Sequence, residues 1–491
     1  MKKLSDIGMI GLGVMGENLA LNMANKGFYV SVYNRTVRGV EEGVVERFVQ
    51  GKGKDKNIRG FNELKRFVQN IERPRKIMMM IKAGKPVDMQ IKELLPFLEA
   101  GDVVIDGGNS HFEDTQRRMA FLEEKGIYFI GTGISGGENG ALKGASIMPG
   151  GSKKAWPLVK DIFRKIAAKC EDGTPCCDWI GEGGAGHFVK MVHNGIEYGD
   201  MQIIAEAYWV MKKLLGLDYP EMHQIFKAWN QGELKSYLIQ ITADIMTKKD
   251  NDGQPLLEKI LDVAGQKGTG RWTVINALNM GSPLTLIADA VFARNLSAKK
   301  EERVRAGQKL PFQENPFIDD KNTFVNDLEK ALYAAKLISY AQGFDLIKTA
   351  DEEFNWNLKY GKIAHLWEGG CIIRSIFLKK IESAFEQQPV LSNLLLDDFF
   401  ASQIKEVEEP WKRVVATTVL HGIPIPSIAS ALSYFYEFRS ADLPANLIQA
   451  QRDYFGAHTY ERKDAQRNQY FHTRWMENKQ VGTPISQQVK H

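Results

Sequence analysis

The first part of the chain, to about residue 180, alternates short apolar runs with amphipathic segments of helical length. Glycine-rich stretches follow several of these runs, at the places where the strands of an open sheet end and ligands bind. The alternation predicts an α/β domain in which helices flank a parallel sheet. Its strands are expected at residues 7–11, 29–34, 76–81, 103–106, 128–131 and 146–150.

A different periodicity begins near Gly183, where apolar residues recur every three to four positions. This spacing is typical of amphipathic helices and predicts that the middle of the chain is almost all helical. Within it, Trp229-Asn230-Gln231-Gly232 followed by Lys235-Ser236 resembles Trp367-Glu368-Gly369-Gly370 followed by Arg374-Ser375. This echo favours an internal duplication of a helical unit over a chance similarity.

After about Ser440 the chain becomes polar but keeps many aromatic residues. Disordered tails are poor in aromatic side chains, so we expect this tail to dock on its own body or on a partner subunit. The chain is therefore expected to have three parts. These are a dinucleotide-binding domain (1–182), an all-helical domain for substrate binding and dimerisation (183–440), and a C-terminal tail (441–491).

The composition is that of an ordinary globular protein, with 44% hydrophobic and 25% charged residues. A net charge of +4 over 491 residues gives no support for a nucleic-acid or membrane surface. No apolar run approaches the ~20 residues that span a bilayer. The cysteines show neither a disulfide framework nor a zinc-binding spacing, which predicts reduced thiols, a cytoplasmic location and no metal site. They are Cys170, Cys176, Cys177 and Cys371.

A glycine-rich motif, Gly11-Leu12-Gly13-Val14-Met15-Gly16, has the spacing G-x-G-x-x-G between a predicted strand and a predicted helix. In that context the first glycine allows a tight turn, the second lets a pyrophosphate approach the backbone, and the third lets helix and strand pack closely. Free N–H groups at the start of the helix then bind the pyrophosphate. The motif predicts a Rossmann-like dinucleotide site, bordered by Lys82, Ala83 and Gly84 after a later strand.

The end of the second predicted strand indicates which dinucleotide binds. NAD sites usually place a carboxylate there for the ribose 2′-hydroxyl, whereas this chain has Asn34-Arg35-Thr36. Arg35 can pair with a 2′-phosphate through two hydrogen bonds, and Thr36 can add a hydroxyl. The expected cofactor is therefore NADP, although a surface arginine in a loop would give the same sequence.

The segment from Lys190 to Tyr198 gathers several reactive side chains. On a helix, Lys190, Asn194 and Glu197 share one face, which His193 and Tyr198 flank. Lys190 and Glu197 are two turns apart, about 10.5 Å along the axis, so both reach a small molecule between them. A solvated polar face is the alternative, but glycines rather than further charges flank this one.

These side chains suit the oxidation and decarboxylation of a hydroxy acid. Hydride loss from an alcohol requires a base for the hydroxyl proton, and a lysine serves if burial or nearby cations make it neutral. The same lysine, as an ammonium, can protonate the carbonyl oxygen during decarboxylation. A protonated Glu197 can then protonate the carbon of the enediol. This chemistry needs no metal.

Three further stretches offer contacts to anions. Ser135-Gly136-Gly137 provides a hydroxyl and backbone amides for a carboxylate. Asn109 brings a carboxamide beyond a strand end. Lys267 and Thr269 lie between glycines in the segment 264–272, as in a phosphate cradle. Each stretch alone would also fit an ordinary turn, but their joint occurrence favours a substrate site.

Together these residues resemble the 6-phosphogluconate dehydrogenase family along essentially the whole chain. The segment from Ile260-Leu261-Asp262 to Gly270-Arg271-Trp272 is similar to the family's signature. Related β-hydroxyacid dehydrogenases share the glycine turn, the Ser135 loop and a lysine like Lys190, but they are shorter and lack such a tail. The resemblance implies NADP-dependent conversion of 6-phosphogluconate to ribulose 5-phosphate and carbon dioxide, in the pentose phosphate pathway.

The resemblance also implies roles for individual residues. Lys190 would be the general base and acid, and Glu197 the second acid. In the family the tail crosses to the other subunit, so Arg452 and His458 would complete the partner's site in an obligate homodimer. The carboxylate and hydroxyl end of the substrate would contact Asn109 (which also borders the cofactor), Ser135, Gly136, Gly137, His193 and Asn194. The phosphate end would contact Tyr198, Lys267, Thr269, Arg294 and Arg452, with His458 nearby.

Two other functions have weaker support. An unphosphorylated hydroxy acid would leave Lys267, Arg294 and Arg452 without an anion to bind. A non-catalytic NADP-binding protein would be expected to have lost Lys190 or Glu197. Departures from the family pattern lie away from the proposed chemistry. They are Arg474 where Asn is usual, Gly13 where Ala is frequent, and polar insertions near 51–59 and 308–313 that are expected to be surface loops.

Overall fold

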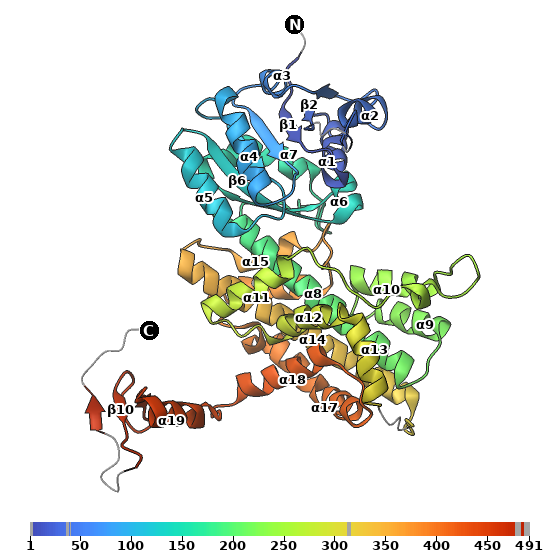
Figure 1. The fold of residues 1–491 in the computed structure, drawn as a ribbon, viewed down its shortest axis with the longest axis vertical. Coiled ribbons are helices and arrows are strands. Elements are labelled where there is room, and N and C mark those ends of the chain that lie inside the picture. The colour runs from blue at the N-terminus through green and yellow to red at the C-terminus, as the bar shows by residue number, and fades with distance from the viewer. Residues whose placement is uncertain (1–2, 36–38, 40, 312–315, 477–482, 486–491) are drawn as a thin grey trace. The chain divides into compact units, whose positions relative to one another are not determined.

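A computed structural model describes the chain except for residues 1–2, 36–38, 40, 312–315, 477–482 and 486–491. The chain forms two compact units, residues 1–432 and residues 433–491. Helix α18 (Pro426–Arg439) continues from the first unit into the second (Figure 1). The candidate chemistry of the α/β and helical segments lies in the first unit, and the tail residues lie in the second.

An eight-stranded sheet occupies the N-terminal part of the first unit, in the order β3-β2-β1-β4-β5-β6-β7-β8 (Figure 1). All neighbouring strands are parallel except β6 and β7, which are antiparallel. The bounds are β1 (Ile7–Ile10), β2 (Val30–Tyr33), β3 (Ile58–Phe61), β4 (Lys76–Met79), β5 (Val103–Asp106), β6 (Tyr128–Ser135), β7 (Ser146–Gly151) and β8 (Gly181–Glu182).

The predicted α/β architecture is confirmed, with three corrections to its details. The sheet is mixed rather than parallel, because β7 runs antiparallel to β6. Strands β3 and β8 were not predicted. The prediction of a surface loop at 51–59 is wrong for its last two residues, which belong to β3. Ile58 is buried there and pairs with Val30. An edge strand with one buried apolar side chain leaves little periodicity in the sequence.

Helices cover both faces of the sheet because successive side chains of each strand point to opposite faces. On β4, Met78 joins one apolar core, whereas Ile77 and Met79 join the other. The first core includes helices α1 (Val14–Asn25), α2 (Val44–Gln50), α6 (Gly137–Lys143) and α7 (Trp156–Ile166), and the second includes α3 (Leu64–Gln69), α4 (Lys85–Leu94) and α5 (Phe112–Glu123).

The segment after β8 is helical, as predicted, and begins with the 29-residue helix α8. A buried ion pair between Lys336 and Asp200 joins α8 to the long helix α14. The helices are α8 (Ala185–Lys213), α9 (Tyr219–Trp229), α10 (Tyr237–Thr247), α11 (Thr269–Met280), α12 (Thr285–Ser297), α13 (Lys300–Lys309), α14 (Lys321–Phe354), α15 (Tyr360–Leu366), α16 (Phe377–Gln387), α17 (Asp398–Leu420) and α18. The predicted loop at 308–313 includes the end of α13 and runs into residues outside the described chain.

The two echoing sequence segments meet in space. Ser236 and Ser375 form an isolated antiparallel bridge. The Tyr237 N–H donates to the Arg374 carbonyl at 3.1 Å, and the Ile376 N–H donates to the Lys235 carbonyl at 3.1 Å. Each segment follows a long helix and a shorter one, α8 and α9 in the first case and α14 and α15 in the second. The pairing supports a duplicated helical unit whose copies face each other.

The second unit is organised around the fully buried carboxylate of Asp453. It accepts hydrogen bonds from the Thr459 and Thr473 N–H groups at 3.0 Å, from His472 Nδ1 at 2.9 Å and from Trp475 Nε1 at 2.9 Å. These contacts tie α19 (Ala445–Gly456) to the small sheet of β9 (Tyr460–Glu461), β10 (Tyr470–His472) and β11 (Thr483–Ile485).

Within the described residues, every helix is too short or too polar to cross a bilayer.

Candidate active site

The N-terminal half of α8 carries the reactive face that the sequence predicted. Lys190 is buried and its Nζ donates a hydrogen bond to Asn194 Oδ1 one turn away. Glu197 follows on the same face, with its side chain partly accessible to solvent. The helix therefore presents an amine and a carboxyl group to one small space, as a two-proton mechanism requires.

The environment shifts the pKa values of these two groups in opposite directions. Burial lowers the pKa of Lys190, and the nearby Glu197 carboxylate only partly opposes this. Burial raises the pKa of Glu197, against the effect of Lys190 and Arg294. Burial thus shifts Lys190 toward the neutral amine and Glu197 toward the protonated acid. Pairs of titratable groups shifted in this way mark acid–base sites.

His193 lies behind Lys190 in a fully buried position. Its Nδ1 is 3.2 Å from Asn194 Oδ1, and its ring meets Trp367 edge to face with centroids 5.5 Å apart. Burial and the adjacent Lys190 charge lower the pKa of His193 well below its usual value. Its Nε2 has no hydrogen-bond partner within the described chain.

Gly133 on strand β6 allows α8 to pack closely on the strand at Lys190. A Cβ at Gly133 would lie 2.2 Å from the Lys190 Cβ, so α8 lies on the strand only because residue 133 is a glycine. At the end of the strand, Ser135 Oγ accepts a 3.4 Å hydrogen bond from the Ile372 N–H. A Cβ at Gly136, whose φ is +137°, would lie 2.3 Å from the Gly370 carbonyl oxygen. The predicted carboxylate loop therefore rests on the second echoing segment.

The predicted phosphate cradle, residues 264–272, packs against α8 at Tyr198. A Cβ at Gly270 would lie 2.5 Å from the ring of Tyr198, so this loop and helix are in close contact. The Arg294 guanidinium lies 3.5 Å over the Tyr198 ring and donates to the Gly265 carbonyl at 3.2 Å. Thr269 is buried at the first turn of α11, and Lys267 is exposed. The structure thus brings the predicted phosphate ligands of the first unit together.

The dinucleotide motif has the geometry that its spacing predicts. Gly11 has a φ of +93°, and a Cβ there would lie 2.6 Å from the Met80 carbonyl oxygen. A Cβ at Gly16 would lie 1.9 Å from the Gly11 carbonyl oxygen. Gly13 has no neighbour within 4 Å, and α1 begins there without a side-chain cap. The open backbone at the helix start fits a pyrophosphate.

The loops around this turn leave the predicted cofactor residues accessible. Asn34 Oδ1 accepts a 2.9 Å hydrogen bond from the Leu12 N–H, which joins the glycine turn to the end of β2. Arg35, Lys82 and Asn109 are exposed. Thr36 lies outside the described residues, and Gly84 caps the start of α4 after Ala83. Arg35, at the end of β2, is thus accessible to a dinucleotide bound on the glycine turn.

Two tail residues belong to the second unit rather than to this constellation. Arg452 Nη1 donates to Gln449 Oε1 at 3.1 Å, and both Arg452 and His458 line a cavity within that unit. The first unit therefore brings together the predicted catalytic residues, the carboxylate loop and most of the phosphate ligands, but not Arg452 or His458.

The sequence did not predict the residues that hold the Asn109 loop in its conformation. Asp106 accepts hydrogen bonds from the Gly108 N–H at 3.0 Å and from Ser110 Oγ at 2.6 Å, which shapes the Asn109 loop. Arg118 is buried beside it at 3.3 Å. An aspartate at a strand end followed by two glycines is the one signal that pointed to this loop. Gly133 gave no signal, because its role depends on a helix more than fifty residues away.

Comparison with known proteins agrees with this geometry. The model of the NAD binding domain of 6-phosphogluconate dehydrogenase matches residues 6–181, and the model of its C-terminal domain matches residues 186–475. The decarboxylating 6-phosphogluconate dehydrogenase of Treponema pallidum is 57% identical over 477 residues, covering 96% of this chain and 97% of that protein. The NADP(+)-dependent decarboxylating enzyme of Bacillus subtilis is 55% identical, covering 96% and 99%.

A solved structure gives the same result. The Plasmodium falciparum 6-phosphogluconate dehydrogenase, described as apo, with NADP+ and with 6-phosphogluconate, superposes with a TM-score of 0.91. It is 44% identical and covers 96% of this chain and all of that chain.

Proposed function

The chain belongs to the 6-phosphogluconate dehydrogenase family, and we propose that Lys190 and Glu197 carry the proton transfers of its reaction. It is an NADP-dependent enzyme that converts 6-phosphogluconate to ribulose 5-phosphate and carbon dioxide, a step of the pentose phosphate pathway. The observation that supports these roles is the opposite shift of two pKa values on one helix face.

The proposed mechanism assigns two successive tasks to one amine. Neutral Lys190 would take the proton of the substrate hydroxyl, and NADP, when bound, would supply the hydride acceptor. The resulting Lys190 ammonium then returns its proton to the carbonyl oxygen as carbon dioxide leaves. Glu197, whose pKa is raised by its partial burial, would give a proton to the carbon of the enediol. Asn194, which accepts from Lys190, orients the amine.

We expect the two ends of the site to bind opposite ends of the substrate and so to set its orientation. The Ser135-Gly136-Gly137 loop, Asn109, His193 and Asn194 would bind the carboxylate and hydroxyl end. Tyr198, Lys267, Thr269 and Arg294 would bind the phosphate. Arg294 is half-buried over Tyr198, so its charge acts in a poorly solvated place where pairing with phosphate is strong.

The proposal extends to the assembly of the enzyme. Arg452 and His458 would complete the phosphate end of a partner's site, which makes the active form a homodimer with shared sites. The exposed apolar residues on α19, Leu447 and Ile448, support a covered position for the tail. We place the enzyme in the cytoplasm, consistent with four free cysteines. The proposed divisions of the chain are 1–182, 183–440 and 441–491.

The direct test measures NADPH formation and carbon dioxide release from 6-phosphogluconate, with wild type and the Lys190→Ala variant. We expect both products in equal amounts with wild type. The variant should lose both by roughly 10²–10⁴-fold, because one group serves both steps. Near-normal turnover by a folded Lys190→Ala variant would refute the proposed role of Lys190.

A further inference from the structure

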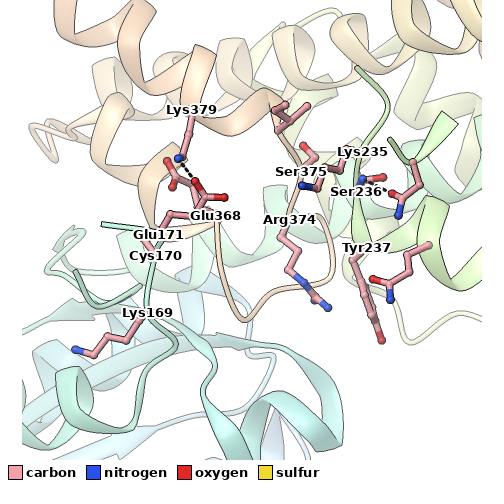
Figure 2. Close-up of a pocket in the computed structure, with 13 residues that line it drawn as sticks. Lys169, Cys170, Glu171, Lys235, Ser236, Tyr237, Glu368, Arg374, Ser375 and Lys379 are labelled. Carbon is pink, nitrogen blue, oxygen red and sulfur yellow. Dashed lines mark hydrogen bonds and ion pairs between the residues drawn. The ribbon is translucent and has the colours of Figure 1, made fainter. Parts of the chain in front are cut away.

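A cluster of metal-ligating side chains lies outside the active site, at the junction of α15 and α16. His365 is in the last turn of α15, Glu368 follows one turn later, and Glu382 projects from α16. Figure 2 shows Glu368 beside Glu171 and Lys379 at a cavity of about 400 Å³. Trp367, between His365 and Glu368, packs on His193 of the active site.

The three side chains have the spacing of ligands around one small cation. His365 Nδ1 is 3.1 Å from Glu382 Oε1 and 3.6 Å from Glu368 Oε1. One ligand atom from each residue lies within 4.8 Å of the other two. Ligand atoms at 2.0–2.2 Å from a tetrahedral zinc ion are separated by roughly 3.4 Å. The observed separations bracket this value.

Glu368 supplies a second, independent observation. Its side chain is only 8% exposed, and within the described chain its Oε1 has no hydrogen-bond partner. Buried carboxylate oxygens are rarely left unpaired, because their desolvation is costly. That oxygen lies 3.6 Å from His365 Nδ1, the nitrogen that also contacts the Glu382 carboxylate at 3.1–3.2 Å.

The chemistry of the donors identifies the class of ion. One imidazole and two carboxylates, with an open position toward a cavity, suit zinc and similar divalent transition metals better than magnesium or calcium. Lys379, one of the basic residues that line the cavity, is paired with Glu171, which offsets its repulsion of a cation. We propose that His365, Glu368 and Glu382 bind one Zn²⁺ ion or a similar divalent transition-metal ion. The sequence suggested no such site, because Glu382 is distant from the other two ligands along the chain.

A competing arrangement uses the other nitrogen of the same histidine. Cys170, Asp172 and His365 also have ligand atoms within 4.8 Å of one another. There, however, His365 Nε2 lies 2.6 Å from Thr174 Oγ1, and Asp172 Oδ1 accepts hydrogen bonds from Thr174 at 2.6 and 2.8 Å. These groups hydrogen-bond each other, whereas Glu368 Oε1 has no hydrogen-bond partner in the described chain and only a 3.6 Å ion pair with His365 Nδ1. The structure therefore favours the Glu368 arrangement.

The test uses the full chain, stripped with a chelator and titrated with Zn²⁺ in competition with a chromophoric chelator. Wild type should bind one Zn²⁺ per chain. Glu368→Gln and, separately, Glu382→Gln should weaken binding by roughly tenfold or more. Glu386→Gln, an exposed glutamate one turn further along α16, should bind as wild type does. Thermal unfolding of the metal-free variants checks that each is folded.

Cobalt substitution identifies the ligands. Co²⁺-loaded wild type should show visible d–d bands without the near-ultraviolet absorption of a thiolate ligand, and Cys170→Ser should leave both spectrum and affinity unchanged. A wild type that binds no Zn²⁺, or a Glu368→Gln variant that binds it normally, would overturn the proposal. Thiolate absorption that disappears in Cys170→Ser would also overturn it, in favour of the Cys170 and Asp172 arrangement.

Discussion

Lys190 and Glu197 are ordinary residue types whose reactivity depends on where α8 places them. An exposed lysine stays protonated at neutral pH and an exposed glutamate stays ionised. Lys190 is buried and Glu197 is partly buried, so the pKa of Lys190 is lowered and that of Glu197 is raised. Each shift brings the group closer to the protonation state that its proposed first task requires.

The pH dependence of kcat/KM should reflect this pair. As pH rises, Lys190 loses its proton at a pH below its ordinary pKa, so activity increases. Glu197 loses its proton at a pH above its own ordinary pKa, and that loss lowers activity. Glu197→Gln should reduce activity by roughly 10²–10⁴-fold. Its residual activity should keep the rising limb and lack the falling one. A falling limb that persists in the variant would assign it to another group.

Arg35 should determine the preference for NADP. It lies exposed immediately after Asn34, whose side chain is bonded to the glycine turn. Arg35→Ala should weaken NADP binding by about 1.5–3 kcal/mol through loss of a charge-assisted hydrogen bond to the 2′-phosphate. NAD binding should change little. Titration of both cofactors measures the difference, with the exposed Arg66→Ala as a control, and equal losses for NADP and NAD would contradict this role.

At the scale of elements, the contact between α8 and the sheet depends on glycines in the strands. Gly133 on β6 lies against the Lys190 side chain, and a Cβ at Gly150 on β7 would lie 2.5 Å from the Gly186 N atom. The helix therefore rests almost directly on two strands, one on each side of the antiparallel pairing. This close approach fixes the depth of Lys190 and so the burial that lowers its pKa.

Gly133→Ala should therefore impair catalysis more than folding. The added methyl would meet the Lys190 Cβ, and displacement of a reacting group by about 1 Å can cost roughly 100-fold in rate. The accompanying overpacking should cost about 1–3 kcal/mol of unfolding free energy. A Cβ at Gly307 on α13 would meet nothing within 4 Å, so Gly307→Ala should leave turnover unchanged and should not destabilise the fold. Steady-state rates and thermal unfolding of both variants test this, and normal turnover by Gly133→Ala would contradict it.

At the scale of the molecule, the helical region supports the site in the first unit, whereas the tail folds as a separate unit. The bridge between Ser236 and Ser375 joins the echoing segments, and the second of them supports the Ser135 loop. The second unit has its own polar centre at Asp453, so Arg452 is held on a folded element rather than on a loose strand of chain. Such a unit can present Arg452 to a partner.

Subunit mixing tests the shared site. Lys190→Ala and Arg452→Ala should each be inactive alone. If the tail serves the partner, a mixed dimer has one site with both lesions and one with neither, so part of the activity should return. Lys190→Ala mixed with Glu197→Gln is the matched control, because every site then keeps one lesion. Absence of recovery in the first mixture, with exchange shown by mass spectrometry, would place Arg452 in its own subunit's site.

Local features of the sequence determined much of this protein. Apolar runs, the Gly11–Gly16 spacing and the helical period of the segment from Lys190 to Glu197 report on residues that are neighbours in the chain. Their structures depend mainly on backbone sterics and on alternation between buried and exposed positions. The architecture, most of the strands and the shared helix face of Lys190, Asn194 and Glu197 were therefore predictable.

Tertiary structure decided the features that depend on residues far apart in sequence. The direction of β7, the strand at Ile58, the fit of Gly133 under Lys190 and the gathering of His365, Glu368 and Glu382 left no periodic signal. The pKa shifts belong to this group as well, because they arise from burial and from charges brought close by folding. A sequence shows which side chains are able to react, whereas only the packed structure determines how deeply each is buried and which groups it meets.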